Sequence, residues 1–355
     1  MNFKIGELFS GPGGLSLGAT NAKIPGNKSF KISHGWASDY DESSCETYKR
    51  NIKGCKSDSI FLEDVRKLNI NKLPEIDCFA YGFPCNDFSL VGKQKGFDGE
   101  FGPLYTYGIK VINKFNPKFF VAENVGGLSS ANDGNSFKKI LLDLGKSGDH
   151  GYKMTVHKYK SELYGIPQTR HRIIIVGIRK DLDLSFKVPK PLTPEPENYK
   201  TAKEALESPI INENAFNNEL TRQSNTVIER LKNIKPGKNV WNSDLPESLR
   251  LNVKGAKLSQ IYRRLDPNKP SYTITGSGGG GTHGYHYEYP RALTNRERAR
   301  IQTFPDNYEF LGTKESVRKQ IGMAVPPVLS EIIFTAILKT FAILKYESIE
   351  PNIKL

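Results

Sequence analysis

The chain has 355 residues, of which 37% are hydrophobic, with four cysteines and a formal net charge of +13. This length accommodates one large domain and a smaller one, and the apolar share suffices for an ordinary core. No apolar run is long enough to suggest a bilayer span, the N-terminus lacks a secretory pattern, and the cysteine spacings match neither a zinc site nor a disulfide framework. We therefore expect a soluble, intracellular protein with reduced thiols.

Short apolar runs alternate with helix-compatible segments in the first half of the chain. The runs typical of strands lie at residues 3–9, 30–38, 76–82 and 118–124, and the segments between them that are compatible with helices include 41–51 and 103–115. This alternation predicts an α/β fold, in which a mostly parallel sheet is covered by helices on both faces.

Residues 152–180 contain two further strand-like runs, joined by the short link YGIPQT. A link of this length cannot cross back over the sheet, so we expect the second run to lie antiparallel to the first. The second strand, RIIIVG from Arg172, then starts at the edge where the parallel strands end.

A Pro- and Lys-rich stretch from about Leu182 to Leu192 predicts a domain boundary. Beyond it, the 44 residues from Thr221 to Arg264 hold ten Lys/Arg and three Asp/Glu, a net +7 of the chain's +13. Such clustering favours a nucleic-acid-binding face over a merely solvated surface in a lysine-rich chain.

Two helices are expected near the C-terminus. The segment LTNRERARIQTFPD has Thr294 as its N-cap and Glu297 three residues later, which is the pattern of a capping box. Residues 328–344 form a strongly apolar run, and we expect this helix to pack back on the first domain.

The run ELFSGPGGLSLG at residues 7–18 is typical of a strand, a glycine-rich turn and a helix start. Glycines let the backbone approach a ligand closely, and the N–H groups of a helix start favour an anionic group. Because the run is not G-x-G-x-x-G, a nucleotide-like cofactor is favoured over a dinucleotide, and a plain strand–helix turn is the alternative. Asp39 and Asp64 end the second and third strands, where each is a candidate ligand to the cofactor or, equally well, a helix N-cap.

Several chemistry-bearing residues are expected at one edge of this sheet. Cys85 and Glu123 follow the carboxyl ends of parallel strands, where ligands bind in open α/β sheets. Gln168, Arg170 and Arg172 reach the same edge from the start of the antiparallel strand. A lone cysteine is more often buried and inert, but cations beside Cys85 would lower the pKa of its thiol and raise its reactivity.

Taken in order, FSGPGG, the acid Asp39, EDV, GFPCNDFS, ENV, QTRHR, RRLDPNKPSYTIT and GMAVPP resemble the motifs of the DNA (cytosine-5)-methyltransferases. The likeness covers nearly the whole chain apart from the stretch between QTRHR and RRLDP. It implies a Rossmann-like S-adenosylmethionine-dependent methyltransferase sheet with a smaller inserted DNA-recognition domain. The implied division is a catalytic and cofactor-binding domain (1–184), a target-recognition domain (185–290), a hinge (291–318) and a C-terminal part of the catalytic domain (319–355).

The resemblance also implies the reaction and its residues. A methyl group would pass from S-adenosylmethionine to C5 of a flipped-out cytosine in a specific duplex sequence. Cys85 would attack C6, Glu123 would contact N3 and the exocyclic amine, and Arg172 with Arg170 would bind the O2 side and the backbone phosphate. The implied cofactor-binding residues are Phe9, Ser10, Gly11, Gly13, Gly14, Leu15, Asp39, Tyr40, Asp64, Val65, Pro84, Leu104, Ala324 and Val325. The implied DNA-binding residues are Ser89, Lys93, Gln94, Lys95, Gln168, Arg263 and Arg264.

Three positions depart from the family pattern, since Asn86 replaces the usual Gln, Met323 replaces the usual Asn, and Asp39 is shorter than the usual Glu. They leave open a catalytically weakened DNA-binding homologue. The other alternative is a tRNA cytosine-5 methyltransferase, against which the long basic stretch argues.

The target-recognition region leaves one alternative open. Trp241 and the loop 276–287 fit DNA contact, although the glycine run in that loop could equally be a hinge without contacts. His283 and His286 have no acidic or cysteine partner nearby, so we expect no metal there.

The compact size resembles a bacterial restriction–modification enzyme, which implies a cytoplasmic monomer acting on duplex DNA away from membranes. It leaves open a cognate restriction endonuclease that acts separately.

Overall fold

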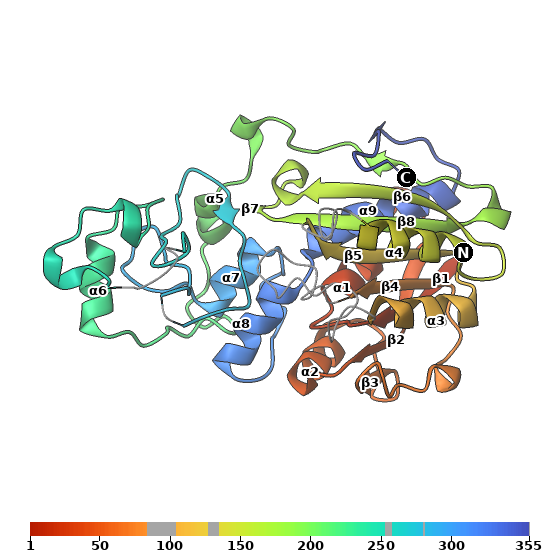
Figure 1. The fold of residues 1–355 in the computed structure, drawn as a ribbon, viewed down its shortest axis with the longest axis horizontal. Coiled ribbons are helices and arrows are strands. Elements are labelled where there is room, and N and C mark those ends of the chain that lie inside the picture. The colour runs from red at the N-terminus through yellow and green to blue at the C-terminus, as the bar shows by residue number, and fades with distance from the viewer. Residues whose placement is uncertain (84–103, 127–134, 253–257, 280, 355) are drawn as a thin grey trace. The chain divides into compact units, whose positions relative to one another are not determined.

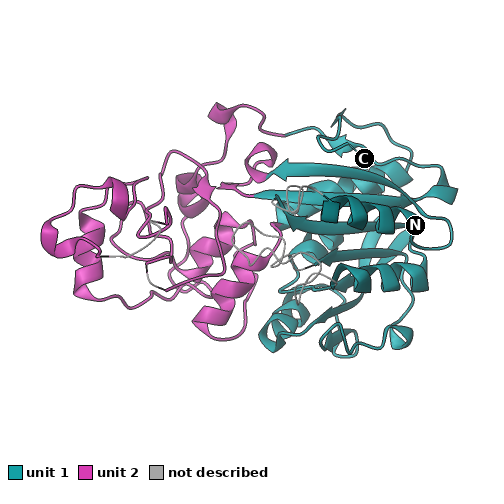
Figure 2. Ribbon diagram, viewed as in Figure 1, with its two compact units in different colours: residues 1–160, 171–191, 327–355 teal, residues 161–170, 192–326 magenta. Residues whose placement is uncertain are grey.

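The chain folds into two compact units (Figures 1 and 2). The computed structural model describes residues 1–83, 104–126, 135–252, 258–279 and 281–354. Unit 1 comprises residues 1–160, 171–191 and 327–355, and unit 2 comprises residues 161–170 and 192–326. The functional division at residues 184, 290 and 318 stays a prediction, because the two units are defined by packing alone.

Unit 1 is built on a seven-stranded sheet in the order β3-β2-β1-β4-β5-β8-β6. Its strands are β1 (Asn2–Leu8), β2 (Lys31–Asp39), β3 (Ile60–Leu62), β4 (Cys78–Gly82), β5 (Phe119–Val125), β6 (Tyr152–Lys160) and β8 (His171–Arg179). The strands from β1 to β5 pair in parallel. Four consecutive buried residues in β4 and in β5 suit strands that are covered on both faces. The predicted α/β fold with a mostly parallel sheet is confirmed.

Strand β8 lies antiparallel to both of its neighbours, β5 and β6. This is the direction that the short link before it predicts. The register pairs Glu123 with Ile174 and Val125 with Arg172, so the start of β8 lies beside the end of β5. Arg172 therefore stands at the edge where the parallel strands end.

Helices cover both faces of this sheet (Figure 1). They are α1 (Gly14–Asn21), α2 (Glu42–Asn51), α3 (Tyr105–Phe115), α4 (Asn135–Lys146) and α9 (Pro327–Phe341). Successive residues of β5 serve opposite faces, as the pleat of a strand requires. The ring of Phe119 packs 6.4 Å from Phe334 and 5.4 Å from Phe341 in α9, whereas Phe120 joins the core beneath α3 and α4.

The apolar helix expected at residues 328–344 is α9, which ends at Phe341 and belongs to unit 1. It contacts α1, where Ser330 Oγ donates to the Leu15 carbonyl at 2.7 Å. The close approach requires Gly18, because a Cβ there would lie 2.4 Å from Ser330 Cβ. By length and composition the segment Lys314–Phe341 could cross a membrane, but 72% of its most apolar window is buried within the protein, as in a core helix.

Unit 2 has shorter elements around a core of its own. Its helices are α5 (Ala202–Glu207), α6 (Asn225–Lys232), α7 (Asn295–Ile301) and α8 (Lys314–Met323). Its core cluster contains Leu231, Ile234, Val240, Leu245, Tyr262, Tyr285 and Ala292. The predicted capping box of α7 is confirmed, since Thr294 Oγ1 accepts the Glu297 N–H and the Glu297 carboxylate accepts the Thr294 N–H.

Short strand pairs and single-turn helices complete both units. Strand β7 (Gln168–Thr169) pairs with β10 (Ser271–Tyr272), and β9 (Val188–Pro189) pairs with β11 (Ser348–Ile349). The 3₁₀ turns are η1 (Ile70–Lys72), η5 (Ser161–Tyr164), η6 (Lys180–Leu182), η7 (Pro196–Asn198), η8 (Val240–Asn242) and η9 (Glu247–Leu249).

Candidate active site

The glycine loop after β1 passes through three positive φ angles, +54° at Phe9, +51° at Gly11 and +95° at Gly13. No atom of the described residues lies within 4 Å of the position that a Cβ of Gly11 would take, apart from its chain neighbours, so the described part of the structure leaves space beside the loop there. Asp39 at the end of β2 anchors this loop, because its Oδ2 accepts the Gly11 N–H at 2.8 Å. The loop and the acid thus lie together at the carboxyl edge of the sheet.

Asp39 keeps acceptor capacity for a ligand. Its Oδ1 accepts the Asp41 N–H at 3.0 Å, and each carboxylate oxygen carries a second lone pair. Burial raises the pKa of Asp39 above its ordinary value, although the two N–H donors act in the opposite direction. Tyr40, the next residue, is 66% exposed at the same edge.

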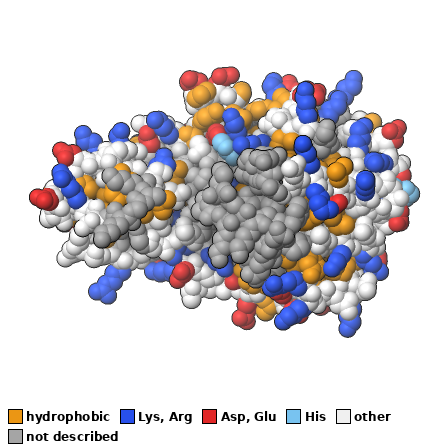
Figure 3. All heavy atoms as spheres, in the orientation of Figure 1, with side chains coloured by type: hydrophobic (Ala, Val, Ile, Leu, Met, Phe, Trp, Pro, Cys, Tyr) orange, Lys and Arg blue, Asp and Glu red, His pale blue; other side chains and the backbone are white. Residues whose placement is uncertain are grey.

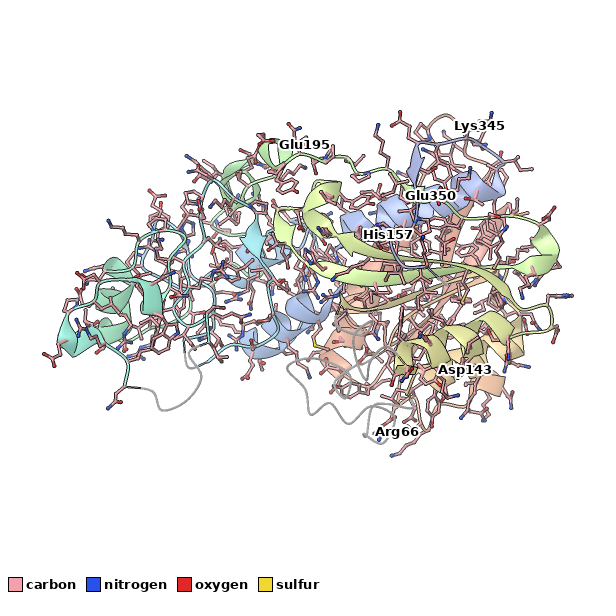
Figure 4. All side chains as sticks on the ribbon, turned by 45° about the horizontal axis from the view of Figure 1, so that its top comes forward. Arg66, Asp143, His157, Glu195, Lys345 and Glu350 are labelled. Carbon is pink, nitrogen blue, oxygen red and sulfur yellow. The ribbon has the colours of Figure 1, made fainter. Side chains whose placement is uncertain are left out.

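The other residues implied for the cofactor differ in burial. Those that are buried in the described structure are Ser10, Gly13, Gly14, Leu15, Val65 and Leu104 in unit 1, and Ala324 and Val325 in unit 2. The Asp64 carboxylate binds the Arg66 guanidinium at 2.5 Å, and this hydrogen bond lowers the pKa of Asp64. Arg66 lies at the outer rim of unit 1 (Figure 4). Pro84 lies outside the described residues.

Glu123 and Arg172 meet at the end of β5. Arg172 Nε lies 2.7 Å from Glu123 Oε1, and both side chains are only 13% exposed. In the neighbouring strand β4, the residue paired with Glu123 is Gly82. A Cβ added to Gly82 would stand 3.0 Å from Glu123 Oε2. The absence of a side chain at Gly82 therefore leaves room for the Glu123 carboxylate beside the exit of β4. A carboxylate in this position can accept from an amine or hold a proton for a ring nitrogen.

Cys85 and Asn86 lie outside the described residues, but the other three cysteines can be compared. Burial raises the pKa of the Cys45 thiol to about 12 and holds that of Cys78 well above its ordinary value. The pKa of Cys55 is raised as well, again by burial. Since the thiolate is the nucleophilic form, these three are poorly suited to attack a substrate. In the sequence, Cys85 follows Gly82, the last residue of β4, by three positions.

Gln168 and Arg170 are fully buried in unit 2. Gln168 Nε2 donates to Gln302 Oε1 at 2.8 Å, and its Oε1 accepts the Ile274 N–H at 2.9 Å. Arg170 donates to the carbonyls of Ile274 and Gly322, both at 3.0 Å. These contacts give both side chains a structural role in unit 2, and their contact with substrate stays a prediction.

The two adjacent arginines in the basic stretch of unit 2 differ in burial and in their contacts. Arg264 is 6% exposed and binds four backbone carbonyls, those of Leu231, Ile234, His286 and Tyr287. Arg263 is partly exposed, with its guanidinium 4.5 Å from the centre of the Tyr272 ring. Arg263 is thus the better placed of the two to meet a phosphate.

Other residues implied for DNA are less informative. Trp241 anchors a loop by donating from Nε1 to the Leu258 carbonyl at 2.9 Å. Ser89, Lys93, Gln94 and Lys95 lie outside the described residues. On the face drawn in Figure 3, Lys and Arg side chains are dispersed among acidic ones over the visible surface.

A buried network beneath the glycine loop went unnoticed in the sequence. The Glu7 carboxylate, 1% exposed, accepts the Ser16 hydroxyl, and Ser16 Oγ accepts the Tyr48 hydroxyl at 2.7 Å. His34 extends this hydrogen-bonded network, since its Nδ1 lies 3.2 Å from the Tyr48 hydroxyl and its Nε2 lies 2.9 Å from Ser59 Oγ. Burial raises the pKa of Glu7 to about 8. An acid at an interior position of an apolar strand is the signal that could have found it.

Comparison with known proteins agrees with this arrangement. The family model for C-5 cytosine-specific DNA methylases matches residues 3–339. Type II methyltransferase M.BbvI of Brevibacillus brevis is 58% identical, over 99% of this chain and 95% of that protein. Type II methyltransferase M.NgoFVII of Neisseria gonorrhoeae is 41% identical, over 99% of this chain and 90% of its own length. A solved structure described as a prophage-encoded DNA modification methyltransferase (E. coli) shares the fold, with a TM-score of 0.70 at 24% identity over 96% and 99% of the two chains.

The mostly parallel sheet, with a glycine loop and an acid at its carboxyl edge, is Rossmann-like, and the family match identifies it as a methyltransferase domain. The chain belongs to the family of C-5 cytosine-specific DNA methylases, and the family match extends over nearly its whole length. Its enzymatic class is DNA (cytosine-5-)-methyltransferase.

Proposed function

We propose that this enzyme transfers a methyl group from S-adenosylmethionine to C5 of a flipped-out cytosine in duplex DNA, through a covalent adduct between Cys85 and C6. The observation that carries the proposal is the ion pair between Glu123 and Arg172, 2.7 Å apart. Glu123 pairs with Gly82 at the end of β4, and Cys85 follows three residues later in the sequence. A carboxylate and a guanidinium at this strand end, with a cysteine three residues after β4 in the sequence, provide the groups needed for nucleophilic attack on an electron-poor ring.

The first step uses the thiolate of Cys85 as a nucleophile. Cytosine C5 is a poor nucleophile by itself, and a bond from Cys85 Sγ to C6 converts the ring into an enamine whose C5 can attack a methyl group. Glu123 accepts from the exocyclic amine and holds a proton at N3, which removes the negative charge that builds on the ring.

Arg172 orients Glu123 through the 2.7 Å contact, so the carboxylate need not reorganise during the reaction. After methylation a base or water removes the C5 proton, the C5–C6 double bond re-forms, and the Cys85 thiolate leaves. Because C5 and C6 are inaccessible inside a duplex, the cytosine must leave the base stack before any of these steps.

The loop after β1 fits the adenosyl part of S-adenosylmethionine. Open space at Gly11 admits a ligand beside the backbone, and the Asp39 carboxylate has lone pairs for two ribose hydroxyls. When bound, the cofactor supplies an electrophilic methyl group on a sulfonium. Phe9, Tyr40, Asp64 and Leu104 would complete the site from neighbouring segments.

The biological setting follows from the relatives. The names of M.BbvI and M.NgoFVII describe type II methyltransferases, so we assign this enzyme to a restriction–modification system, in which DNA methylation protects host DNA. A monomer in the bacterial cytosol, with any cognate endonuclease acting as a separate protein, is the matching expectation. Residues 185–290 would select the DNA sequence.

Labelled methyl transfer tests the substrate class. The enzyme is incubated with S-adenosylmethionine carrying a tritiated methyl group and either plasmid DNA or total tRNA. We expect label in plasmid cytosine at C5 and none in tRNA. Label in tRNA alone would replace the proposal with the tRNA alternative, and bisulfite sequencing of the labelled plasmid would give the target sequence.

A further inference from the structure

A buried acid lies on the strand that leads into the glycine loop. Glu7 is 1% exposed and belongs to β1, where the residues paired with it in β2 and β4 are Ala37 and Ala80. Residues that are paired across a sheet share one face of it, so the two small side chains leave room for the carboxyl group. Buried acids are rare unless a partner satisfies them, and the partners of this one define what it can do.

Hydroxyl groups bind this carboxyl. Ser16 in the first turn of α1 donates to Glu7 Oε2, and the Tyr48 hydroxyl in α2 donates to Ser16 Oγ at 2.7 Å. The Tyr48 hydroxyl also acts on Glu7 itself as a hydrogen-bond partner. A hydroxyl can donate to a carboxylate or accept from a carboxylic acid. The network therefore accommodates Glu7 in both protonation states, whereas a Lys or Arg partner would hold it ionised.

The network continues to the surface. His34 Nδ1 lies 3.2 Å from the Tyr48 hydroxyl, and His34 Nε2 lies 2.9 Å from Ser59 Oγ. His34 and Ser59 are both partly exposed. A chain of hydrogen bonds thus links the buried carboxyl with solvent, which gives a proton a path in either direction.

The same network supports the loop that is implied for the cofactor. A Cβ on Gly13, where φ is +95°, would stand 2.9 Å from Tyr48 Cδ2, so the tyrosine ring lies directly against the loop backbone. Ser16 is the third residue of the helix that starts where this loop ends. Asp39 binds the Gly11 N–H of the same loop at 2.8 Å. Glu7 is therefore coupled to the cofactor loop through one hydrogen bond and one packed ring.

The charge of Glu7 responds to charges at the cofactor edge. Burial raises the pKa of Glu7 to about 8, and the negative charge of Asp39 raises it as well. The groups that face the carboxyl are Ser16 from α1, Tyr48 from α2 and Asp39 from the end of β2, with His34 one hydrogen bond further away. Burial lowers the pKa of His34, so its imidazole is neutral near pH 8. Because an anion at this edge raises the pKa of Glu7, a cation at the same edge lowers it.

The cofactor and its product differ by such a cation. The methyl group leaves S-adenosylmethionine without its bonding electron pair, so the sulfonium becomes the neutral thioether of S-adenosylhomocysteine. The adenosine and the amino acid are common to both molecules, so contacts with those parts bind the two equally well. Only a group that responds to the lost charge can tell them apart.

We infer that Glu7 discriminates between the cofactor and its product, favouring the sulfonium when it is ionised and losing this preference when it is protonated. Glu7 releases a proton to solvent when S-adenosylmethionine binds, and it takes one up from solvent once the sulfonium has been consumed. Ser16 and Tyr48 are positioning residues that hold the carboxyl in either state. This inference rests on the proposed use of S-adenosylmethionine.

The ratio of two dissociation constants tests the inference. Isothermal titration gives the Kd of S-adenosylmethionine and of S-adenosylhomocysteine over a pH range that brackets the pKa of Glu7 at about 8, for the parental protein and for Glu7→Gln. We expect the parental preference for S-adenosylmethionine, divided by that of Glu7→Gln, to rise with pH by about fivefold or more. The amino groups of the ligands titrate in the same range, and the division removes their contribution. A purely structural role would weaken both ligands equally and leave the ratio unchanged.

Proton exchange gives an independent readout. The titrations are repeated near pH 8 in buffers of different ionisation enthalpy, which yields the number of protons exchanged on binding. S-adenosylmethionine should release more protons from the parental protein than from Glu7→Gln, because the bound cation lowers the pKa of Glu7. S-adenosylhomocysteine should show no such difference between the two proteins.

Two further variants control for folding and for loss of an acid. Tyr48→Phe keeps Glu7 and removes a hydroxyl that lowers its pKa, so the pH dependence should persist and move to higher pH. This variant tests the inference even if Glu7→Gln fails to fold. Glu46→Gln removes an exposed acid of the same helix, 3.5 Å from Lys49, and should keep the parental curve. Thermal unfolding shows which variants are folded.

The outcomes separate the inference from the proposed function. The same pH dependence of the ratio in the parental protein and in Glu7→Gln overturns the inference and leaves the cofactor in place. A curve of Glu46→Gln that matches Glu7→Gln overturns it as well. If the parental protein binds neither ligand, the proposed cofactor fails and the inference fails with it. If the ratio changes as expected but no DNA is methylated, the proposed transfer to DNA fails and the role of Glu7 stands.

Discussion

Arg172 Nε lies 2.7 Å from Glu123 Oε1, across the antiparallel pair formed by β8 and β5. The contact joins the end of one strand to the start of another, so sheet register alone brings the two groups together. Both side chains are largely buried, which strengthens the pair relative to an exposed one.

Glu123→Gln should lower the single-turnover methylation rate by about 10²–10³-fold, because the amide cannot hold a proton at N3. DNA affinity should change little. Arg172→Lys keeps a cation near Glu123 and should lose less activity than Arg172→Gln. Rapid-quench assays with saturating DNA measure all three rates. A Glu123→Gln enzyme at parental rate would remove Glu123 from the chemistry.

Cys85→Ala should abolish methylation and retain DNA binding, because only the nucleophile is lost. Cys55→Ser is the matched control, since the pKa of the Cys55 thiol is raised by burial, and it should retain parental activity. Methyl transfer and gel-shift assays on the same preparations check both variants. Equal activity in Cys85→Ala and the parental enzyme contradicts the nucleophile assignment.

Asp39→Asn should weaken cofactor binding by about tenfold, because an amide offers one acceptor oxygen in place of two and still has to satisfy the Gly11 N–H. Asp58→Asn, an exposed position, serves as control and should leave the affinity unchanged. Isothermal titration with S-adenosylmethionine gives both values. Parental affinity in Asp39→Asn would place the ribose elsewhere.

Glu7 should make stability depend on pH between about 4.5 and 8. Its folded pKa of about 8 lies above the value of 4.5 for a free Glu, so its contribution is full below about pH 4.5 and is lost as pH rises to about 8. Each unit of this difference corresponds to about 1.4 kcal/mol. The free energy of unfolding of the parental protein minus that of Glu7→Gln should therefore fall across this range and stay level above it.

Urea unfolding at a series of pH values measures this difference, with the exposed Glu75→Gln as control. A difference that is independent of pH would mean that Glu7 is ionised in the folded protein at neutral pH.

Two histidines should make the protein less stable as the pH falls, which is opposite to the effect of Glu7. Burial lowers the pKa of His157 and of His286 to about 4, and the Nδ1 of each accepts a backbone N–H, from Asn352 and from Glu288. Their contribution to stability is present above about pH 6.5 and is lost as pH falls toward 4. Figure 4 shows His157 on β6, near the C-terminal segment that carries Glu350.

NMR of ¹³C-labelled imidazoles checks the histidine prediction, with His157→Gln used to assign one signal. Three resonances that titrate near pH 4 are expected, those of His157, His283 and His286. Titration of the His157 signal near 6.5 would show that its ring is solvated.

The sequence predicts the strand directions and the edge where Glu123 and Arg172 meet, because a short link sets the direction of β8. It also predicts the capping box of α7, since Thr294 and Glu297 are local partners. Hydrogen bonds between distant segments cannot be predicted from the sequence. Gln168 is bound by Gln302 and Ile274, and Arg264 by four carbonyls of two other segments, so neither arrangement can be read from neighbouring residues.

Covalent trapping tests the central claim most directly. Fluorine at C5 of cytosine cannot leave as a proton does, so the adduct with the enzyme should persist once the methyl group has been transferred. Plasmid fragments made with 5-fluorocytosine are incubated with enzyme and S-adenosylmethionine, separated under denaturing conditions and mapped by mass spectrometry. The account predicts a denaturation-resistant adduct whose modified peptide contains Cys85. No adduct from an enzyme that methylates ordinary DNA, or an adduct at another residue, would contradict it.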